Sequence, residues 1–170
     1  ILVAGGTGAI GRLLVPQLVG LGHEVIAVTR NPGKAKDVEA LGAKAAVADA
    51  LDREELTAAV KQAGPEVIIS QLTSIPGAAN FKRLDEDFAL TNRLRTEATD
   101  TLLEATRLVG ARRFISQSFC GWPFARVGGP IKDEFAPLDP EPPSSFRQTL
   151  AAIRHLEERV KKAEGFEALA

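Results

Sequence analysis

A glycine-rich run near the amino terminus has the residue types and the spacing of a phosphate-binding turn. Residues 4–11 read AGGTGAIG, which satisfies G-x-G-x-x-G and, counted from Gly5, also G-x-x-G-x-x-G. Glycine permits a tight turn, lets the backbone approach a phosphate and lets a helix pack closely against a strand. The free amide groups and the dipole at the start of that helix favour negative charge. We therefore favour a dinucleotide-binding turn over a purely structural one.

Two arginines point to the kind of dinucleotide. An acid at the end of the second strand would accept a hydrogen bond from the ribose 2′-OH of NAD, whereas an arginine there accommodates the 2′-phosphate of NADP. The sequence has Arg30 at this place, no acid until Asp37, and Arg12 directly after the third glycine. Two guanidinium groups can hold one phosphate. We expect NADP in preference to NAD; the alternative is that both are ordinary surface arginines.

Asp49 is a further candidate contact. It lies just past the predicted third strand, where the adenine edge of a dinucleotide would sit, and a carboxylate can accept from the adenine amino group. The alternative is that Asp49 caps the next helix. Asp52 is the better cap, because Glu55 follows three residues later as in a capping box. We therefore assign Asp49 to the ligand.

Strands and helices that alternate along the chain must position these residues. Buried strands are predicted from apolar runs at 1–4, 25–28, 45–48, 67–69 and 114–115, and the start of a sixth at 165–170. Helices are predicted at 9–21, 31–41, 52–64, 85–108 and 145–163. Short apolar strands that alternate with helices predict an α/β fold. We expect a Rossmann-like doubly wound parallel sheet, with strand order 3-2-1-4-5 and the start of strand 6.

Length and composition exclude several classes of protein. The chain has 170 residues, a formal net charge of -1 and one cysteine. The length suits one domain, and the charge balance argues against a nucleic-acid partner. A lone cysteine forms no internal disulfide, so we expect a cytoplasmic protein. No apolar run approaches the roughly 18 residues of a membrane span, so we expect no membrane partner. No His/Cys/Asp cluster has metal-ligand spacing, so we expect no metal.

Four stretches carry a resemblance to a known family: AGGTGAIG at 4–11, ADALD at 48–52, LLEATRLVGARRFISQS at 102–118 and RHLEERV at 154–160. Together they resemble the extended short-chain dehydrogenase/reductase family, the NAD-dependent epimerase/dehydratase group. The TRNP at 29–32 is more similar to atypical, NADP-linked relatives that include NmrA-like proteins. The resemblance implies that residues 1–170 form an NAD(P)-binding Rossmann domain. The chain has no Met, so we expect it to be part of a longer product, without the family's smaller substrate-binding part.

The resemblance also implies contacts along the whole dinucleotide. The pyrophosphate would lie against Gly5, Thr7, Gly8, Ala9, Ile10 and Gly11. The adenosine would lie against Arg30, Asp49, Ala50 and Leu51. The nicotinamide ribose would lie beside Gln71, Leu72 and Thr73.

The catalytic residues of the family are where this sequence departs from it. The family uses a Ser or Thr after strand five and a Tyr-x-x-x-Lys on the next helix, in which the lysine lowers the tyrosine pKa and the tyrosine shuttles a proton. This chain has no Tyr, and Thr149 and Ile153 stand at the two positions. Ser118 lies near the serine position, although the closest register places Phe119 there. Lys132 is the nearest candidate cation in the following loop.

Two functions stay open at this point. The first is an NAD(P)-binding oxidoreductase or epimerase/dehydratase-like enzyme for a small carbonyl, hydroxyl or sugar-nucleotide substrate, with Ser118 contacting the substrate. The second is a non-catalytic, NmrA-like redox sensor, which the absent Tyr/Lys pair favours. The resemblance allows a homodimer. In the Pro-rich segment 119–144, Trp122 and Phe124 either wall the substrate site or anchor the loop, and Cys120 is expected to be a small buried apolar residue.

Overall fold

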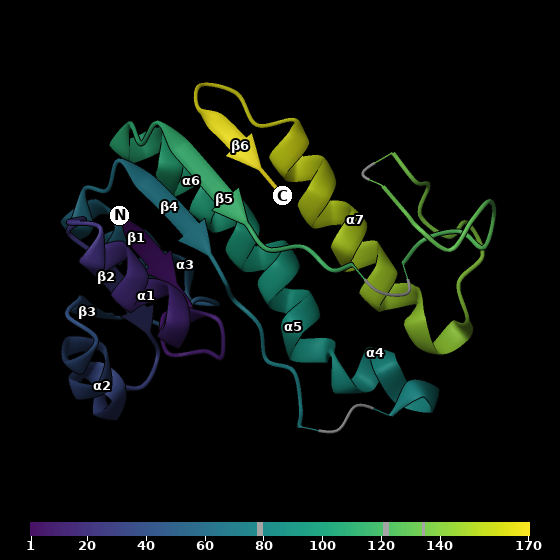
Figure 1. Ribbon diagram of the computed structural model, residues 1–170, viewed down its shortest axis with the longest axis horizontal. Coiled ribbons are helices and arrows are strands. Elements are labelled where there is room, and N and C mark those ends of the chain that lie inside the picture. Colours follow the sequence, from purple (N-terminus) through teal and green to yellow (C-terminus); the bar gives the residue numbers. More distant parts are fainter. Residues whose placement is uncertain (78–79, 121–122, 134) are drawn as a thin grey trace.

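The sheet at the centre of the molecule has six parallel strands in the order β3-β2-β1-β4-β5-β6 (Figure 1). The computed structural model describes residues 1–77, 80–120, 123–133 and 135–170. The strands are β1 (Leu2–Ala4), β2 (Ile26–Thr29), β3 (Lys44–Val47), β4 (Val67–Ser70), β5 (Arg113–Ser116) and β6 (Glu167–Leu169). The predicted α/β class and strand order are confirmed, and the predicted sixth strand pairs with β5.

Helices cover both faces of the sheet. One face carries α1 (Gly11–Gly20) and α2 (Ala35–Ala40), and the other carries α3 (Arg53–Ala63), α6 (Thr99–Val109) and α7 (Arg147–Lys161). Two short helices, α4 (Leu84–Asp87) and α5 (Ala89–Arg93), precede α6 in the chain. No helix in the described ranges is long and apolar enough to cross a membrane.

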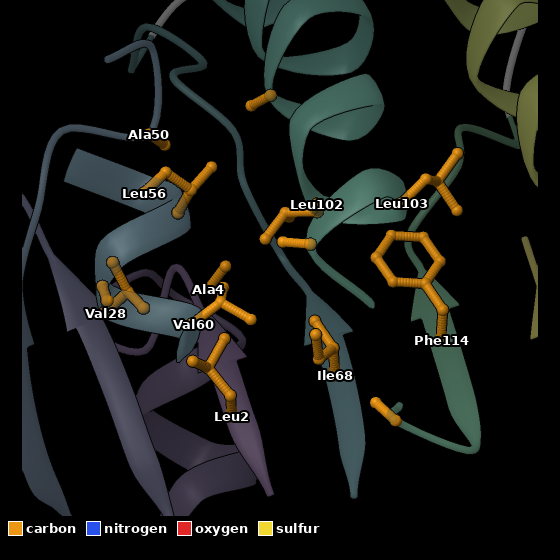
Figure 2. Packing of buried hydrophobic residues seen from close by; sticks show 14 of the residues in the cluster. Leu2, Ala4, Val28, Ala50, Leu56, Val60, Ile68, Leu102, Leu103 and Phe114 are labelled. Atoms are coloured by element: carbon orange, nitrogen blue, oxygen red, sulfur yellow. The ribbon is translucent and has the colours of Figure 1, made fainter. Parts of the chain in front are cut away.

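The core consists of two apolar layers that follow the alternation of side chains along each strand. Leu2 and Ala4 point to the face of α3 and α6, whereas Val3 points to the face of α1 and α2. Figure 2 shows the first layer, in which Ile68 and Phe114 of neighbouring strands are fully buried. Burial of each such side chain stabilises the fold by about 1.5–3 kcal/mol. The strands are thereby held in one register.

This register brings the carboxyl ends of four strands to one edge of the sheet. Ala4 lies opposite both Val28 and Ser70, and Ser70 lies opposite Ser116. The ladder continues past the strand ends, because the Gln71 amide donates to the Ala4 carbonyl at 2.8 Å. The loops that leave β1, β2, β4 and β5 therefore begin side by side.

The first two helices differ from the predicted ones in where they begin. The first helix begins at Gly11 rather than at the predicted residue 9, and Pro16 lies within it. The helix predicted over 31–41 is divided into a 3₁₀ turn, Pro32–Lys34, and α2. The Asn31 side chain caps that turn by accepting from the Gly33 amide at 2.9 Å. This turn becomes part of the site described below.

The long helix predicted over 85–108 is interrupted twice. The chain leaves helical geometry at Phe88, where φ is -101° and ψ is 5°. A π-helical turn then spans Leu94–Ala98, between α5 and α6. Such turns carry one residue more than an α-helical turn and occur often at functional sites. The uniform helix expected from the sequence is therefore wrong in its first half.

Helix capping was predicted correctly for α3 and wrongly for α7. Asp52 caps α3 by accepting from the Glu54 and Glu55 amides at 2.9 and 3.0 Å. Glu55 does not return the bond to Asp52 as a capping box would, because its carboxylate accepts from the Asp49 amide at 2.9 Å. Ser145, the predicted cap of the last helix, instead lies inside a 3₁₀ turn that precedes α7.

The actual cap of α7 comes from a distant part of the chain. The Asp85 carboxylate of α4 accepts from the amides of Gln148 and Thr149 at 3.0 and 2.8 Å. An acid at a helix amino terminus satisfies free amides and complements the dipole. Asp85 therefore fastens α4 to the start of α7.

We expect Asp85→Ala to lower the free energy of unfolding by about 1–2 kcal/mol, because two amides of α7 would lose their acceptor. Chemical denaturation with far-UV circular dichroism measures this change. Glu86→Ala is the matched control, since Glu86 is exposed and its pairing with Arg83 is a surface contact of 3.7 Å. An equal effect of the two substitutions would contradict the assigned cap.

Candidate functional site

A cleft of about 330 Å³ lies at the carboxyl ends of the central strands. The loops after β1 and β4 lead away to opposite faces there, which is the switch point where doubly wound sheets bind ligands. Ten of the predicted contact residues line this cleft: Gly5, Thr7, Gly8, Arg30, Asp49, Ala50, Leu51, Gln71, Leu72 and Thr73. Residues from loops far apart in the sequence are thus brought together at one edge.

The glycine turn is held so close to the sheet that side chains would not fit. Gly5 has a φ of +89°, and a Cβ on it would stand 2.6 Å from the Gln71 carbonyl oxygen. A Cβ on Gly11 would stand 2.4 Å from the Gly5 carbonyl oxygen. Gly8 differs, because its Cβ would meet only one atom within 4 Å, the Gly5 carbonyl oxygen at 3.2 Å, and it lines the cleft. The space over Gly8 is therefore the open side of the turn.

The start of α1 offers hydrogen-bond donors next to this open side. The Gly8 amide is used within the turn, donating to the Gly5 carbonyl at 3.0 Å. The amides of Ala9 and Ile10 donate to no acceptor in the described part of the chain. The first turn of α1 also contains no acidic residue. These free donors suit a phosphate group, although Ala9, Ile10 and Gly11 do not themselves line the cleft.

The end of the cleft beside β2 is positively charged. Arg30 and Lys34 are both exposed, line the cleft and form no ion pair among the described residues. Asp49 contributes the opposite charge, and its Oδ1 accepts from the Leu51 amide at 2.9 Å. Arg12, the predicted partner of Arg30, lies on α1 outside the lining. Lys34, which the sequence reasoning missed, is the second basic residue of the lining.

Further lining residues were also missed: Val28, Thr29, Asn31, Lys34, Ala48, Ser74, Leu90 and Leu94. Lys34 follows a Pro-Gly pair shortly after Arg30, so the basic character of this turn was a usable signal. Leu90 and Leu94 gave none, because apolar residues at helical spacing are ordinarily assigned to the core. They belong instead to α5 and the π turn, which face the cleft.

Ser118 lies apart from the cleft lining. Its hydroxyl donates to Oε1 of Glu157 on α7 at 2.7 Å, in a partly buried position. The two positions that the resemblance aligns with the family's Tyr and Lys lie in the core. Thr149 is 1% exposed and accepts from the Asn92 side chain at 3.1 Å, and Ile153 is completely buried. Neither side chain faces the cleft.

The remaining candidates lie in and near the Pro-rich segment. Lys132 is partly exposed and donates to the Val127 carbonyl. Cys120 is exposed, so the prediction of a small buried apolar residue is wrong. Phe124 pairs with Leu138 in an antiparallel bridge, which favours its role as a loop anchor. Trp122 lies outside the described residues. No group of three or more His, Cys, Asp or Glu side chains within the described ranges could hold a metal ion.

One curated protein is similar in sequence over nearly the whole chain. A 3-diazoavenalumate denitrifying reductase from a Streptomyces species is 42% identical over 167 residues, which cover 96% of this chain and 52% of that protein. The chain therefore spans about half the length of this relative.

Solved structures share the fold. The UDP-glucose 4-epimerase of Thermus thermophilus, in complex with NAD, is 24% identical with a TM-score of 0.73, covering 95% of this chain and 51% of that one. The UDP-Glc/GlcNAc 4-epimerase of Campylobacter jejuni is 21% identical with a TM-score of 0.75, covering 95% and 48%. The fold is thus the one implied by the resemblance to extended short-chain dehydrogenases/reductases. Residues 5–166 match the family model described as NAD(P)H-binding, and the chain belongs to that family.

Proposed function

We propose that the protein is an NADPH-dependent reductase of a small electrophilic molecule. One observation carries the proposal: the glycine turn is open at Gly8, whereas Thr149 and Ile153, which the resemblance aligns with the family's Tyr and Lys, are buried in the core. The cofactor site is therefore kept while the usual proton shuttle is not. The reductase activity of a relative at 42% identity supports the direction of the reaction.

The chain's residues fit a dinucleotide laid along the cleft. The open side of Gly8 and the free amides of Ala9 and Ile10 would hold the pyrophosphate. Gly5 and Gly11 would act indirectly, by keeping the turn close to the sheet. Asp49, Ala50 and Leu51 would lie against the adenine, and Gln71, Leu72 and Thr73 beside the nicotinamide ribose.

The preference for NADPH rests on the two exposed cations of the cleft. Arg30 and Lys34 are unpaired within the described chain, so a 2′-phosphate would find two donors without displacing an existing partner. Arg12 is less well placed than the sequence suggested, because it does not line the cleft. We therefore assign the 2′-phosphate to Arg30 and Lys34.

The absent tyrosine restricts the substrates that fit. Reduction of a carbonyl places negative charge on its oxygen, which then needs a proton donor. Ser118 lies near the serine position of the family, but its hydroxyl is hydrogen-bonded to Glu157. An electrophile that is already cationic needs no such donor. When bound, the reduced nicotinamide supplies a hydride, and a hydride with an arenediazonium ion gives the arene and N₂ without any added proton. A diazo compound, as in the relative's name, is thus a fitting substrate class.

A redox sensor without catalysis is the second candidate. The same missing Tyr/Lys pair favours it, since a protein that only reports the cofactor needs the cleft and no proton shuttle. Both candidates require dinucleotide binding and differ in turnover.

We expect Gly8→Val to abolish binding of NADPH, because its side chain would fill the open side of the turn. Isothermal titration calorimetry measures the loss. Gly20→Ala is the matched control: it lies at the end of the same helix with no atom within 4 Å of an added Cβ, so affinity should stay unchanged. Undiminished binding by Gly8→Val would reject the phosphate assignment.

We expect Arg30→Asp and Lys34→Glu each to weaken NADPH binding by about tenfold or more, since a charge-assisted hydrogen bond contributes roughly 1.5–3 kcal/mol. NADH affinity should change little, and the ratio of the two dissociation constants is the measurement. Arg12→Asp serves as the control of equal charge change outside the cleft. If Arg12→Asp alters the ratio more than the other two, the assignment of the 2′-phosphate is wrong.

Turnover separates the reductase from the sensor. We expect oxidation of NADPH, followed by absorbance at 340 nm, with benzenediazonium or with a member of an aldehyde, ketone and quinone panel. The activity should disappear in Gly8→Val and persist in Gly20→Ala. Tight NADPH binding without turnover on any of these acceptors would favour the sensor.

A further inference from the structure

The segment between β3 and α3 is held in place by a network of hydrogen bonds to its backbone. The Ala48 amide donates to a carbonyl of β2 at 3.1 Å, and the Asp52 amide donates to the Asp49 carbonyl at 3.0 Å. The Leu51 amide donates to Oδ1 of Asp49 at 2.9 Å. Ala48, Asp49 and Leu51 all line the cofactor cleft. This network therefore shapes one wall of the cleft.

Glu55 adds to this network the one bond from a side chain outside the segment, within the described ranges. Its Oε2 accepts from the Asp49 amide at 2.9 Å. Glu55 does not line the cofactor cleft; it lines a second hollow, between β3 and α3. The carboxylate thus holds the Asp49 backbone from outside the cleft, while Asp49 itself lines the cleft.

The Asp49 carboxylate keeps one oxygen available to a ligand. Oδ1 accepts from the Leu51 amide, whereas Oδ2 accepts no hydrogen bond from any described residue. Arg93 of α5 is close enough to respond to this charge: its pKa is raised chiefly by its hydrogen bonds to Glu97 and, to a smaller extent, by Asp49. The Arg93 guanidinium is bonded to both Glu97 oxygens at 2.8 Å and forms no ion pair with Asp49. Asp49 therefore keeps its negative charge facing the cleft.

The conformation of the Asp49 backbone decides where this free oxygen points. Asp49 is exposed, so no packing against neighbouring side chains holds its carboxylate. Hydrogen bonds weaken steeply when their distance or angle departs from the optimum. A carboxylate that is to recognise one group of a ligand must consequently be held through its own main chain, and Glu55 supplies that hold.

We propose that Glu55 is a positioning residue for recognition of the base: by holding the Asp49 backbone, it directs Oδ2 of Asp49 toward the exocyclic amino group of the adenine. The proposal rests on the proposed function, in which Asp49 lies against the adenine. Glu55 touches neither the base nor the reacting atoms, and it acts only through Asp49.

The test is isothermal titration calorimetry of the protein with NADP and with its analogue that carries hypoxanthine instead of adenine. The analogue has a carbonyl oxygen in place of the amino group, so the Asp49 carboxylate loses a donor and meets an acceptor. We expect the wild type to bind NADP about tenfold more tightly than the analogue. Asp49→Ala should abolish this preference and defines its complete loss.

Glu55→Ala should lower the preference to about threefold or less. Glu55→Gln should retain it, because the amide oxygen can still accept from the Asp49 amide. A merely structural role for Glu55 would weaken both dinucleotides alike and leave the ratio of the two dissociation constants unchanged. In the double variant of Asp49→Ala and Glu55→Ala, the ratio should equal that of Asp49→Ala alone, because the two residues act as one unit.

Glu54→Ala is the matched control. Glu54 also lies in the first turn of α3 and is exposed, so its loss removes the same charge from the helix start. Its amide donates to Asp52, but its carboxylate bonds to no described residue. This variant should keep the preference for adenine.

Equal affinity of the wild type for the two dinucleotides would overturn the proposal. An unchanged ratio in Glu55→Ala would do the same, as would an equal loss of preference in Glu54→Ala. If the wild type binds neither dinucleotide, the proposed function fails instead.

Discussion

The contact of the glycine turn with the end of β4 is the constraint on which the cleft depends. The turn after β1 folds back until the backbone of Gly5 reaches the carbonyl of Gln71, and α1 begins against the same turn at Gly11. Two strands and one helix therefore meet at a place where only backbone fits. The buried strands fix the register that makes this approach possible, so the shape of the cleft follows from packing in the core.

The charges of the molecule are distributed more unevenly than its net charge of -1 suggests. Arg30 and Lys34 stand at the β2 end of the cleft, with Asp49 as the one carboxylate lining it among the described residues. The lining also includes the apolar side chains Leu90 and Leu94 and the polar side chains Gln71, Thr73 and Ser74. The cleft therefore carries an excess of positive charge on a chain that is slightly negative overall.

The sequence predicts best what depends on neighbours in the chain. Strand order, the glycine turn and the Asp52 cap follow from short patterns, and each is found as predicted. The cap of α7 could not be found in this way, because Asp85 lies 63 residues before Gln148, the first amide that it accepts from. That Lys34 lines the cleft and Arg12 does not could not be predicted for a related reason. Which cation turns toward a cleft depends on how a short 3₁₀ turn is set against the sheet.

The π turn changes the phase of the long helical segment. Its additional residue rotates α5 relative to α6 by about 100° compared with an uninterrupted α-helix. Leu90 can therefore face the cleft while Leu102 and Leu103 of α6 face the core. A single residue inserted or removed here would turn the whole cleft-facing side of α5 away without changing any residue on it. Helix phase, and not only side-chain type, therefore decides which residues of α5 line this cleft.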